Sequence, residues 1–344
     1  MTQITYNNES LFDDVFYTVK IIDHAYKLLT LAYDENLNVF RLSHTPFHLK
    51  KKMKPKMENK IKVWENIIKN SNLITNNEDI FINEDVIPFI THCSKVGTVH
   101  GYHDLFSIII KYLDDLNKYS KYKILIYKDS QQGILDIIDH LCYLNVLDKN
   151  KLIFIDSNKI YKFKSMCFIK NIYDSYNIDT NKEEILTFLK KLITFKNNYI
   201  INKVSYLKPP KFNIDNILIV KTQQINNVLK HDKLSFNDNE VIEFCKKYNY
   251  TCIKPETMNE VVFYNLLNNG KKYIFSFGSS FLKNYPFINI NCQKIDVISK
   301  IGTKYQKEME GYVKKNYFLS KETFNIKTDI NFHSIENFKD FELK

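Results

Sequence analysis

Hydrophobic and polar positions follow two different rhythms along this chain of 344 residues. The N-terminal part contains short runs of aromatic and β-branched residues, which are typical of β-strands. These runs cover residues 16–22, 25–33, 39–42 and 86–92, and a helical pattern over 57–68 interrupts them. Asp34, Glu35 and Asn36 stand between the second and third runs and predict a hairpin turn. We therefore expect residues 1–94 to be rich in β-structure.

From residue 95 onward, short apolar runs alternate with segments whose hydrophobic side chains recur at helical spacing. The runs KILIY at 123–127 and NILIV at 216–220 are the clearest candidates for buried strands. Ile134, Ile137 and Leu141 lie on one face of the helix that follows the first of these runs. Strands that alternate with helices predict parallel sheets with helices on both faces.

The adjacent prolines Pro209 and Pro210 mark the clearest boundary, because proline fits neither the interior of a helix nor a central strand. A strand–helix series lies on each side of them, so the sequence predicts an α/β protein with two Rossmann-like domains and a cleft between them. We expect residues 1–94 to form a β-rich N-terminal part of the first domain and residues 95–208 to form its Rossmann-like part. Residues 209–300 would form the second Rossmann-like domain, and residues 301–344 a C-terminal helix with a tail.

The formal net charge of +10 would suit a nucleic-acid-binding protein. Only Arg41 among the 49 basic residues is an arginine, however, and arginine is the side chain best suited to bidentate recognition of phosphate and guanine. Lysine, asparagine, isoleucine and tyrosine have AT-rich codons, so an AT-rich genome accounts for much of the charge. We expect no specific nucleic-acid partner.

The six cysteines form no C-x-x-C pair and accompany no zinc-binding pair of histidines. Several lie in apolar runs, so we expect reduced, small core residues. No apolar run is long enough to span a bilayer, and residues 1–11 lack the apolar stretch of a secretory signal. The sequence predicts a cytoplasmic protein without a transmembrane segment and leaves its oligomeric state open.

Ligands of open α/β sheets bind beyond the carboxyl ends of the strands. That rule selects four candidate loops, which are residues 97–103, 221–227, 254–259 and 278–282. A flexible loop that carries His100, His103 and Asp104 could hold a general base or a phosphate-binding imidazole. An equally weighted interpretation is a glycine turn with His103 packed on the next helix.

Gly278, Ser279 and Ser280 follow a predicted strand and open a predicted helix. Backbone N–H groups at such a helix start can bind phosphate oxygens, and a glycine turn with a serine N-cap is the simpler alternative. Lys221, followed by Thr222, comes after the first strand of the second domain and could neutralise a diphosphate, with an ordinary surface lysine as the alternative.

The loop between the second and third strands of that domain contains Glu256 and Asn259. Thr257 and Glu260 have the spacing of a capping box at the start of the next helix. The G-x-G-x-x-G and Walker A motifs are missing from the chain, as are the D-x-D pair and the G-x-S-x-G elbow. These absences disfavour dinucleotide oxidoreductases and P-loop NTPases, and we expect no cofactor and no metal.

Three stretches, in this order, resemble glycosyltransferase family 61, the group that includes plant xylosyltransferases and bacterial capsular-polysaccharide enzymes. They are KVGTVHGYHDLFSIIIKYL, the strand–helix succession from YKILIY to KSMCFI, and the series from NILIVKTQ to FSFGSSF. Together they cover roughly residues 95–300. The chain departs from the family at Phe277, where the family has His, at Ser279 and Ser280 for Ala-Gly, and at Lys221 with Thr222 for arginine.

The resemblance implies a GT-B-like arrangement and an inverting, metal-independent transfer of a sugar from a nucleotide sugar to a glycan or protein acceptor. The second domain would hold the donor, and the implied donor-binding residues are Lys221, Thr222, Glu256, Asn259, Gly278, Ser279 and Ser280. The first domain would offer the acceptor surface, with His103 or Asp104 as the base.

Two rival hypotheses remain at this point. The departures at Phe277 and Thr222 favour a non-catalytic derivative, which would be a binding or scaffold protein on the same fold. The net charge motivates a nucleic-acid binder, which steep salt dependence of oligonucleotide binding would support.

Overall fold

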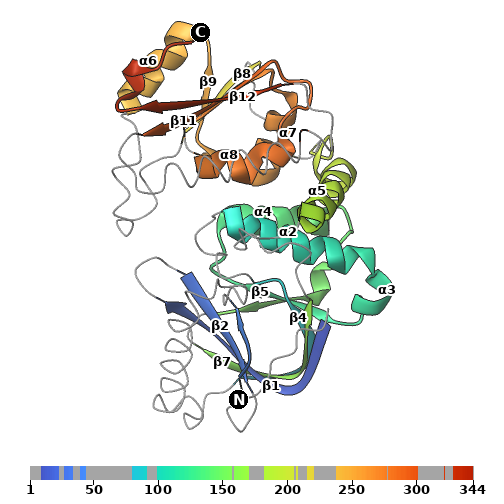
Figure 1. The fold of residues 1–344 in the computed structure, drawn as a ribbon. Helices are drawn as coiled ribbons and strands as arrows, with labels where there is room; N and C mark the ends of the chain where they lie inside the picture. Colours follow the sequence, from blue (N-terminus) through green and yellow to red (C-terminus); the bar gives the residue numbers. More distant parts are fainter. Residues whose placement is uncertain are drawn as a thin grey trace. The chain divides into compact units, whose positions relative to one another are not determined.

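The computed structural model describes thirteen segments of the chain: 9–22, 27–33, 39–43, 80–90, 99–156, 159–169, 182–204, 207, 215–220, 238–276, 278–300, 321 and 328–343. The chain divides into two compact units, each shown in Figure 1. Unit 1 contains Met1–Gln131 and Leu147–Thr180, and unit 2 contains Gln132–Val146 and Asn181–Lys344. The prolines Pro209 and Pro210, predicted as the boundary, lie outside the described residues.

Unit 1 contains a seven-stranded sheet in the order β3-β2-β1-β7-β4-β5-β6. Its strands are β1 (Glu9–Ile22), β2 (Lys27–Tyr33), β3 (Val39–Ser43), β4 (Ile80–Pro88), β5 (Lys123–Tyr127), β6 (Leu152–Ile155) and β7 (Ile160–Ile169). The pairs β7–β4, β4–β5 and β5–β6 are parallel, whereas β1–β2, β2–β3 and β1–β7 are antiparallel. The β-rich N-terminal part therefore belongs to the same sheet as the predicted buried strand at Lys123–Tyr127.

The α-helices in the described part of unit 1 are α2 (Val99–Asp114) and α3 (Leu116–Tyr119). Large apolar side chains of α2, including Tyr102, Phe106 and Ile109, are almost fully buried. A second set of buried residues, from β4, β5 and β7, makes a core cluster around Leu125, Tyr127, Phe163 and Met166. The apolar positions of α2 are thus buried in unit 1.

Unit 2 contains a five-stranded sheet in the order β12-β11-β10-β8-β9, and every pair in it is parallel. Its strands are β8 (Asn216–Ile219), β9 (Thr251–Ile253), β10 (Lys272–Phe275), β11 (Lys294–Lys300) and β12 (Ile330–Ile335). Its helices are α4 (Gln132–Tyr143), α5 (Lys182–Phe195), α6 (Asp238–Tyr248), α7 (Glu260–Asn269) and α8 (Gly278–Asn284). The prediction of parallel strands at 123–127 and 216–220 in two separate sheets is confirmed.

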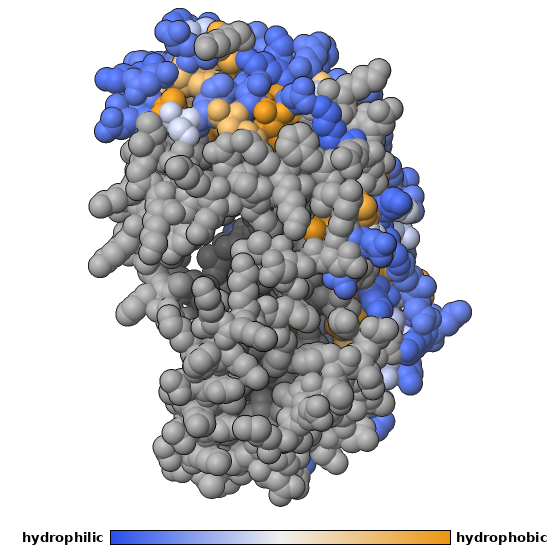
Figure 2. All heavy atoms as spheres, in the orientation of Figure 1, coloured by the Kyte–Doolittle hydropathy of each residue, from blue (hydrophilic) through white to orange (hydrophobic). Residues whose placement is uncertain are grey.

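Helices lie on both faces of the sheet of unit 2 (Figure 1). On one face, Phe244 of α6 packs in a cluster with Leu218, Ile274 and Ile298. On the other face, Phe281 of α8 meets the ring of Phe275 edge to face, with centroids 5.1 Å apart. On the face seen in Figure 2, the described residues of unit 2 are mostly hydrophilic, with hydrophobic residues among them. This arrangement is the one expected for a parallel sheet, whose strands are buried on both sides.

Two features differ from the predicted division of the chain. Helices α4 and α5 belong to unit 2, although they precede the prolines in sequence. The C-terminal part, predicted as a helix with a tail, contributes strand β12, which pairs with β11 from Ile295↔Ile330 onward. The sheet of unit 2 therefore includes residues beyond 300, because β12 forms hydrogen bonds with the edge of β11 that would otherwise be unpaired. Within the described part of the chain, no helix is both long and apolar enough to cross a membrane.

Candidate functional site: the carboxyl edge of the unit 2 sheet

The strand order of unit 2 identifies one position at which a ligand is expected. The chain starts at β8, adds β9 on one side of it, and then adds β10 on the other side. The direction in which strands are added therefore reverses between β8 and β10. Doubly wound sheets with this order bind ligands beyond the carboxyl ends of the two strands at the reversal.

Backbone hydrogen bonds show how far the strands stay together at this edge. The N–H of Ser276 donates to the carbonyl of Ile219 at 3.0 Å, and the N–H of Val220 donates to the carbonyl of Ile253 at 2.9 Å. Val220 and Ser276 are both buried. Lys221 and Thr222 follow Val220 directly in the sequence and lie outside the described residues. The sheet thus ends where the predicted donor-binding residues begin.

Helix α8 begins at Gly278, as the sequence predicted, two residues after Ser276. It is held from its far end, because the Lys283 ammonium lies 2.8 Å from the Glu260 carboxylate of α7. The side chains of this ion pair are only 12% and 5% exposed, so water screens the pair weakly. The Asn284 amide donates to the carbonyl of Ser280 at 2.8 Å. The ion pair ties α8 to α7, and the hydrogen bond lies within α8, whose first turn contains Gly278, Ser279 and Ser280.

The segment after β9 forms a 3-10 turn at Pro255–Thr257, and Glu256 is exposed there. The predicted capping box of Thr257 and Glu260 is wrong. Asn259 is the N-cap of α7, and its side-chain oxygen accepts from Val261 at 3.0 Å and from Val262 at 3.4 Å. The Thr257 hydroxyl donates to the carbonyl of Lys254 instead. The 3-10 turn moves the helix start two residues further along than the sequence spacing suggested.

A carboxylate from α4 accepts a hydrogen bond at the N-terminus of α7. Oδ2 of Asp136 accepts from the N–H of Glu260 at 2.9 Å, and Oδ1 accepts from the Gln132 amide at 2.9 Å. Burial raises the pKa of Asp136, and the nearby charge of Glu260 adds to this, while the two hydrogen bonds act in the opposite direction. Because protein groups already satisfy this helix start, the α7 end offers a bound anion fewer free donors than its position suggests.

His103 and Asp104 lie within helix α2, and the prediction that they belong to a flexible loop is wrong. The helix runs through Gly101, because the apolar positions around it, such as Tyr102 and Leu105, gain more from burial than the glycine costs. His103 is 4% exposed and Asp104 is 6% exposed. They belong to unit 1, whereas Glu256, Asn259 and Gly278 belong to unit 2. A general base has to reach the proton that it removes, so the catalytic role of these two residues stays a prediction.

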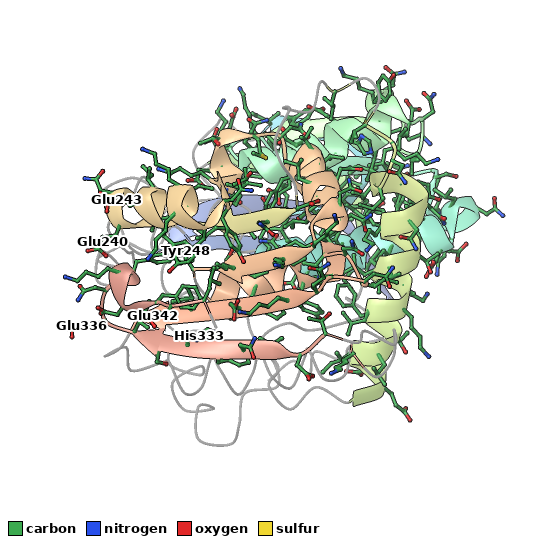
Figure 3. The ribbon with its side chains drawn as sticks, turned by 90° about the horizontal axis from the view of Figure 1, so that it is seen from above. Glu240, Glu243, Tyr248, His333, Glu336 and Glu342 are labelled. Carbon is green, nitrogen blue, oxygen red and sulfur yellow. The ribbon has the colours of Figure 1, made fainter. Side chains whose placement is uncertain are left out.

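Sequence reasoning missed a second polar cluster in the sheet of unit 2. Asp296 on β11 is 1% exposed, and its Oδ1 lies 2.8 Å from Nε2 of His333 on β12. The Lys294 ammonium lies 3.4 Å from its Oδ2. Figure 3 shows His333 at the same end of unit 2 as Glu240 and Glu336. The periodicity of the chain gave no signal for this pair, because the two residues meet only when β12 joins the sheet.

The His333 ring also packs on Phe341, with centroids 4.9 Å apart. A buried carboxylate that orients an imidazole can support proton transfer, and it can equally secure an edge strand. The packing against Phe341 favours the second role here. Among the residues that the structure describes, no group of His, Cys, Asp and Glu side chains is arranged to hold a metal ion.

Comparison with known proteins does not extend these observations. A scan against protein-family models finds no match for this chain, and a search of curated proteins finds none. The resemblance to glycosyltransferase family 61 therefore rests on the residues of this sequence alone. What the structure defines is an α/β protein with two units, one of which contains a doubly wound parallel sheet.

Proposed function

We propose that unit 2 binds a nucleotide sugar at the carboxyl ends of β8 and β10 and that the protein is a glycosyltransferase of the metal-independent, inverting kind. The observation that carries this proposal is the reversal of strand order between β8 and β10. Lys221 and Thr222 follow the first of these strands, and Gly278, Ser279 and Ser280 follow the second. Residues implied by the family resemblance thus follow, in the sequence, the two strands beyond which sheets of this order bind ligands, and this supports the proposal.

The chemistry of these residues suits a diphosphate. A glycine at the start of α8 lets phosphate oxygens approach the backbone, where a Cβ would stand in the way. The hydroxyls of Ser279 and Ser280 add two hydrogen-bond donors, and Lys221 supplies a positive charge. Stabilising the leaving diphosphate with such groups is one way to promote sugar transfer without a metal. The acceptor would be a glycan or a glycoprotein.

A second candidate function is binding without catalysis. Phe277 stands where the family has histidine, and His103 and Asp104, the candidate bases, are almost fully buried. Both observations favour a protein that uses the same fold as a binding or scaffold module. A binding module of this kind would have the same fold as the proposed glycosyltransferase and would differ from it in not turning over a substrate.

A panel of nucleotide sugars and free nucleoside diphosphates tests the proposal through the melting temperature of the full chain. A ligand at about a hundred times its Kd should raise Tm on the order of 5 °C for a domain of this size. The Gly278→Val variant should lose this shift. Gly133→Val places the same change in the first turn of α4, elsewhere in unit 2, and should keep it.

Product analysis with the binding member of the panel separates the two candidate functions. Sugar transfer or slow hydrolysis of the donor supports the glycosyltransferase, whereas binding without either reaction supports the binding module. If no member of the panel stabilises the wild-type protein, the proposed donor site is wrong.

A further inference from the structure

Two cysteine thiols of unit 2 contact each other. Cys245 lies in the last turn of α6 and Cys252 lies on β9, and their side chains share a hydrogen bond. Both belong to the core cluster between α6 and the sheet, where Cys245 is buried and Cys252 is partly buried. Both are free thiols in this structure.

The backbone between them fixes this approach. Asn249 adopts a left-handed conformation with φ 55°, and the N–H of Tyr250 donates to the carbonyl of Cys245 at 2.9 Å. This is the hydrogen-bond pattern of a Schellman motif, which ends α6 and turns the chain directly into β9. The side chains of Cys245 and Cys252 therefore pack in the same cluster, with a connection of six residues, 246–251, between them.

We propose that Cys245 and Cys252 form a redox-reactive dithiol that closes to an intramolecular disulfide by exchange with a small-molecule disulfide. Disulfide formation needs two cysteines whose side chains approach each other, and these two pack in one cluster and share a hydrogen bond. Cys292 differs, because its thiol bonds to the hydroxyl of Thr328 at 3.5 Å.

The exchange proceeds in two steps that balance. The thiolate of the more accessible Cys252 attacks a sulfur of the small disulfide, so that a mixed disulfide forms on Cys252 and one small thiolate leaves. Cys245 then loses its proton and attacks the sulfur of Cys252, and the second small thiol leaves. Two protein thiols are oxidised to one disulfide, and the small disulfide is reduced to two thiols.

The environment of the two residues sets this order. The hydrogen bond with Cys252 and burial raise the pKa of the Cys245 thiol, so this thiol holds its proton more tightly than an ordinary cysteine. A buried thiol with a raised pKa is a poor first nucleophile. Once Cys252 is part of the mixed disulfide, its hydrogen bond with Cys245 is lost, and with it that part of the rise in the pKa of Cys245. Cys245 can then lose its proton and attack the neighbouring sulfur as a thiolate.

The disulfide would tie α6 to the sheet beside the aromatic cluster of the C-terminal segment. Phe244, the neighbour of Cys245, packs against Phe338 with centroids 5.2 Å apart and against Phe341 at 5.5 Å. The N–H of Phe338 also donates to the Glu240 carboxylate of α6 at 3.1 Å. Oxidation would therefore fix the position of α6, against which the C-terminal segment packs.

Tryptic mapping of the folded chain, treated with glutathione disulfide at mildly alkaline pH and alkylated under acid quench, tests the proposal. Lys246 and Lys247 lie between the two cysteines, so trypsin separates them into peptides 234–246 and 248–271. We expect these two peptides to appear as one disulfide-linked species that reductant separates, with a loss of two of the six thiols of the chain.

Single substitutions distinguish this pair from other cysteines. Cys245→Ser should stop the reaction at a stable glutathione adduct on Cys252, whereas Cys142→Ser, a change at a half-buried cysteine of α4, should leave the linked peptide unchanged. Circular dichroism confirms that each variant is folded. The proposal is overturned if the wild-type protein stays fully reduced, keeps a stable adduct on Cys252, or links either cysteine to a different one. The outcome does not depend on whether unit 2 binds a nucleotide sugar.

Discussion

Replacing Lys196 with methionine should stabilise the protein at neutral pH. Lys196 begins a π-helical turn, Lys196–Ile200, at the end of α5 and is 3% exposed. Its ammonium donates to the Asn268 side-chain oxygen at 3.3 Å, and no ion pair with a carboxylate is found for it among the described residues. Burial lowers the pKa of this lysine from its ordinary value of 10.5 to about 8. The positive charge is therefore held at a site that disfavours it.

The pKa shift gives the size of this effect. A difference of one pKa unit corresponds to about 1.4 kcal/mol, so the shift of Lys196 destabilises the protonated folded state by about 3 kcal/mol. Methionine keeps an unbranched apolar chain and removes the charge, at the loss of one hydrogen bond worth about 1 kcal/mol. We expect Lys196→Met to raise the free energy of unfolding by about 2 kcal/mol at pH 7.

The pH dependence identifies the cause. Below about pH 8 the lysine is protonated in both the folded and the unfolded state, and the full cost is present. Between about 8 and 10.5 the unfolded state binds more protons than the folded state, so the stability of the wild-type protein rises with pH relative to the variant. The advantage of Lys196→Met should therefore shrink through this interval and vanish near its upper end.

Urea denaturation of wild type and Lys196→Met at several pH values between 7 and 10.5 measures this difference. Lys190→Met, a change at an exposed position of α5, is the matched control and should alter stability by less than about 0.5 kcal/mol at every pH. The reasoning is refuted if Lys196→Met destabilises the protein at pH 7, or if its effect is the same at both ends of the interval.

Three further outcomes follow from named contacts. Asp136→Ala should lower the free energy of unfolding by about 1–3 kcal/mol, because the N–H of Glu260 loses its acceptor, whereas Asp136→Asn should cost less; chemical denaturation at pH 7 compares them. Gly270→Ala should cost about 1–3 kcal/mol in the same assay, because a Cβ there would lie 2.7 Å from the buried ring of Tyr273, and no loss would show that the ring can move. Lys221→Ala should weaken binding of a nucleotide sugar by about 1.5–3 kcal/mol in calorimetry, and an unchanged Kd would remove Lys221 from the site.

Local patterns predicted the elements of this fold and only part of their assembly. The apolar face of α4 was visible because Ile134, Ile137 and Leu141 recur at helical spacing, and all three are buried. That α4 packs in unit 2 was not visible, since this depends on α7 and on the bond from Asp136 to Glu260, 124 positions away. Periodicity reports that a face is buried and does not report what covers it.

The same limit explains the differences at the candidate site. The residues after β8 and β10 could be selected from sequence, because strand ends and glycines are local features. Whether these strand ends lie at a reversal of strand order depends on long-range pairing, such as that of Lys272 with Asn216. The position of His103 and Asp104 could not be decided from sequence, since the glycines in the segment GTVHGYHD are compatible with a flexible loop, whereas the structure has a helix that burial stabilises. The dithiol at Cys245 and Cys252 likewise required the turn at Asn249, which brings a helix end beside a strand.

Calorimetric titration of the full chain with a panel of nucleotide sugars is the most direct test of the central claim, the donor site between the ends of β8 and β10. The account predicts that at least one nucleotide sugar binds with one site per chain, that Gly278→Val abolishes this binding, and that Gly133→Val leaves it intact. Absence of binding by the wild-type protein, or equal binding by Gly278→Val, would contradict it.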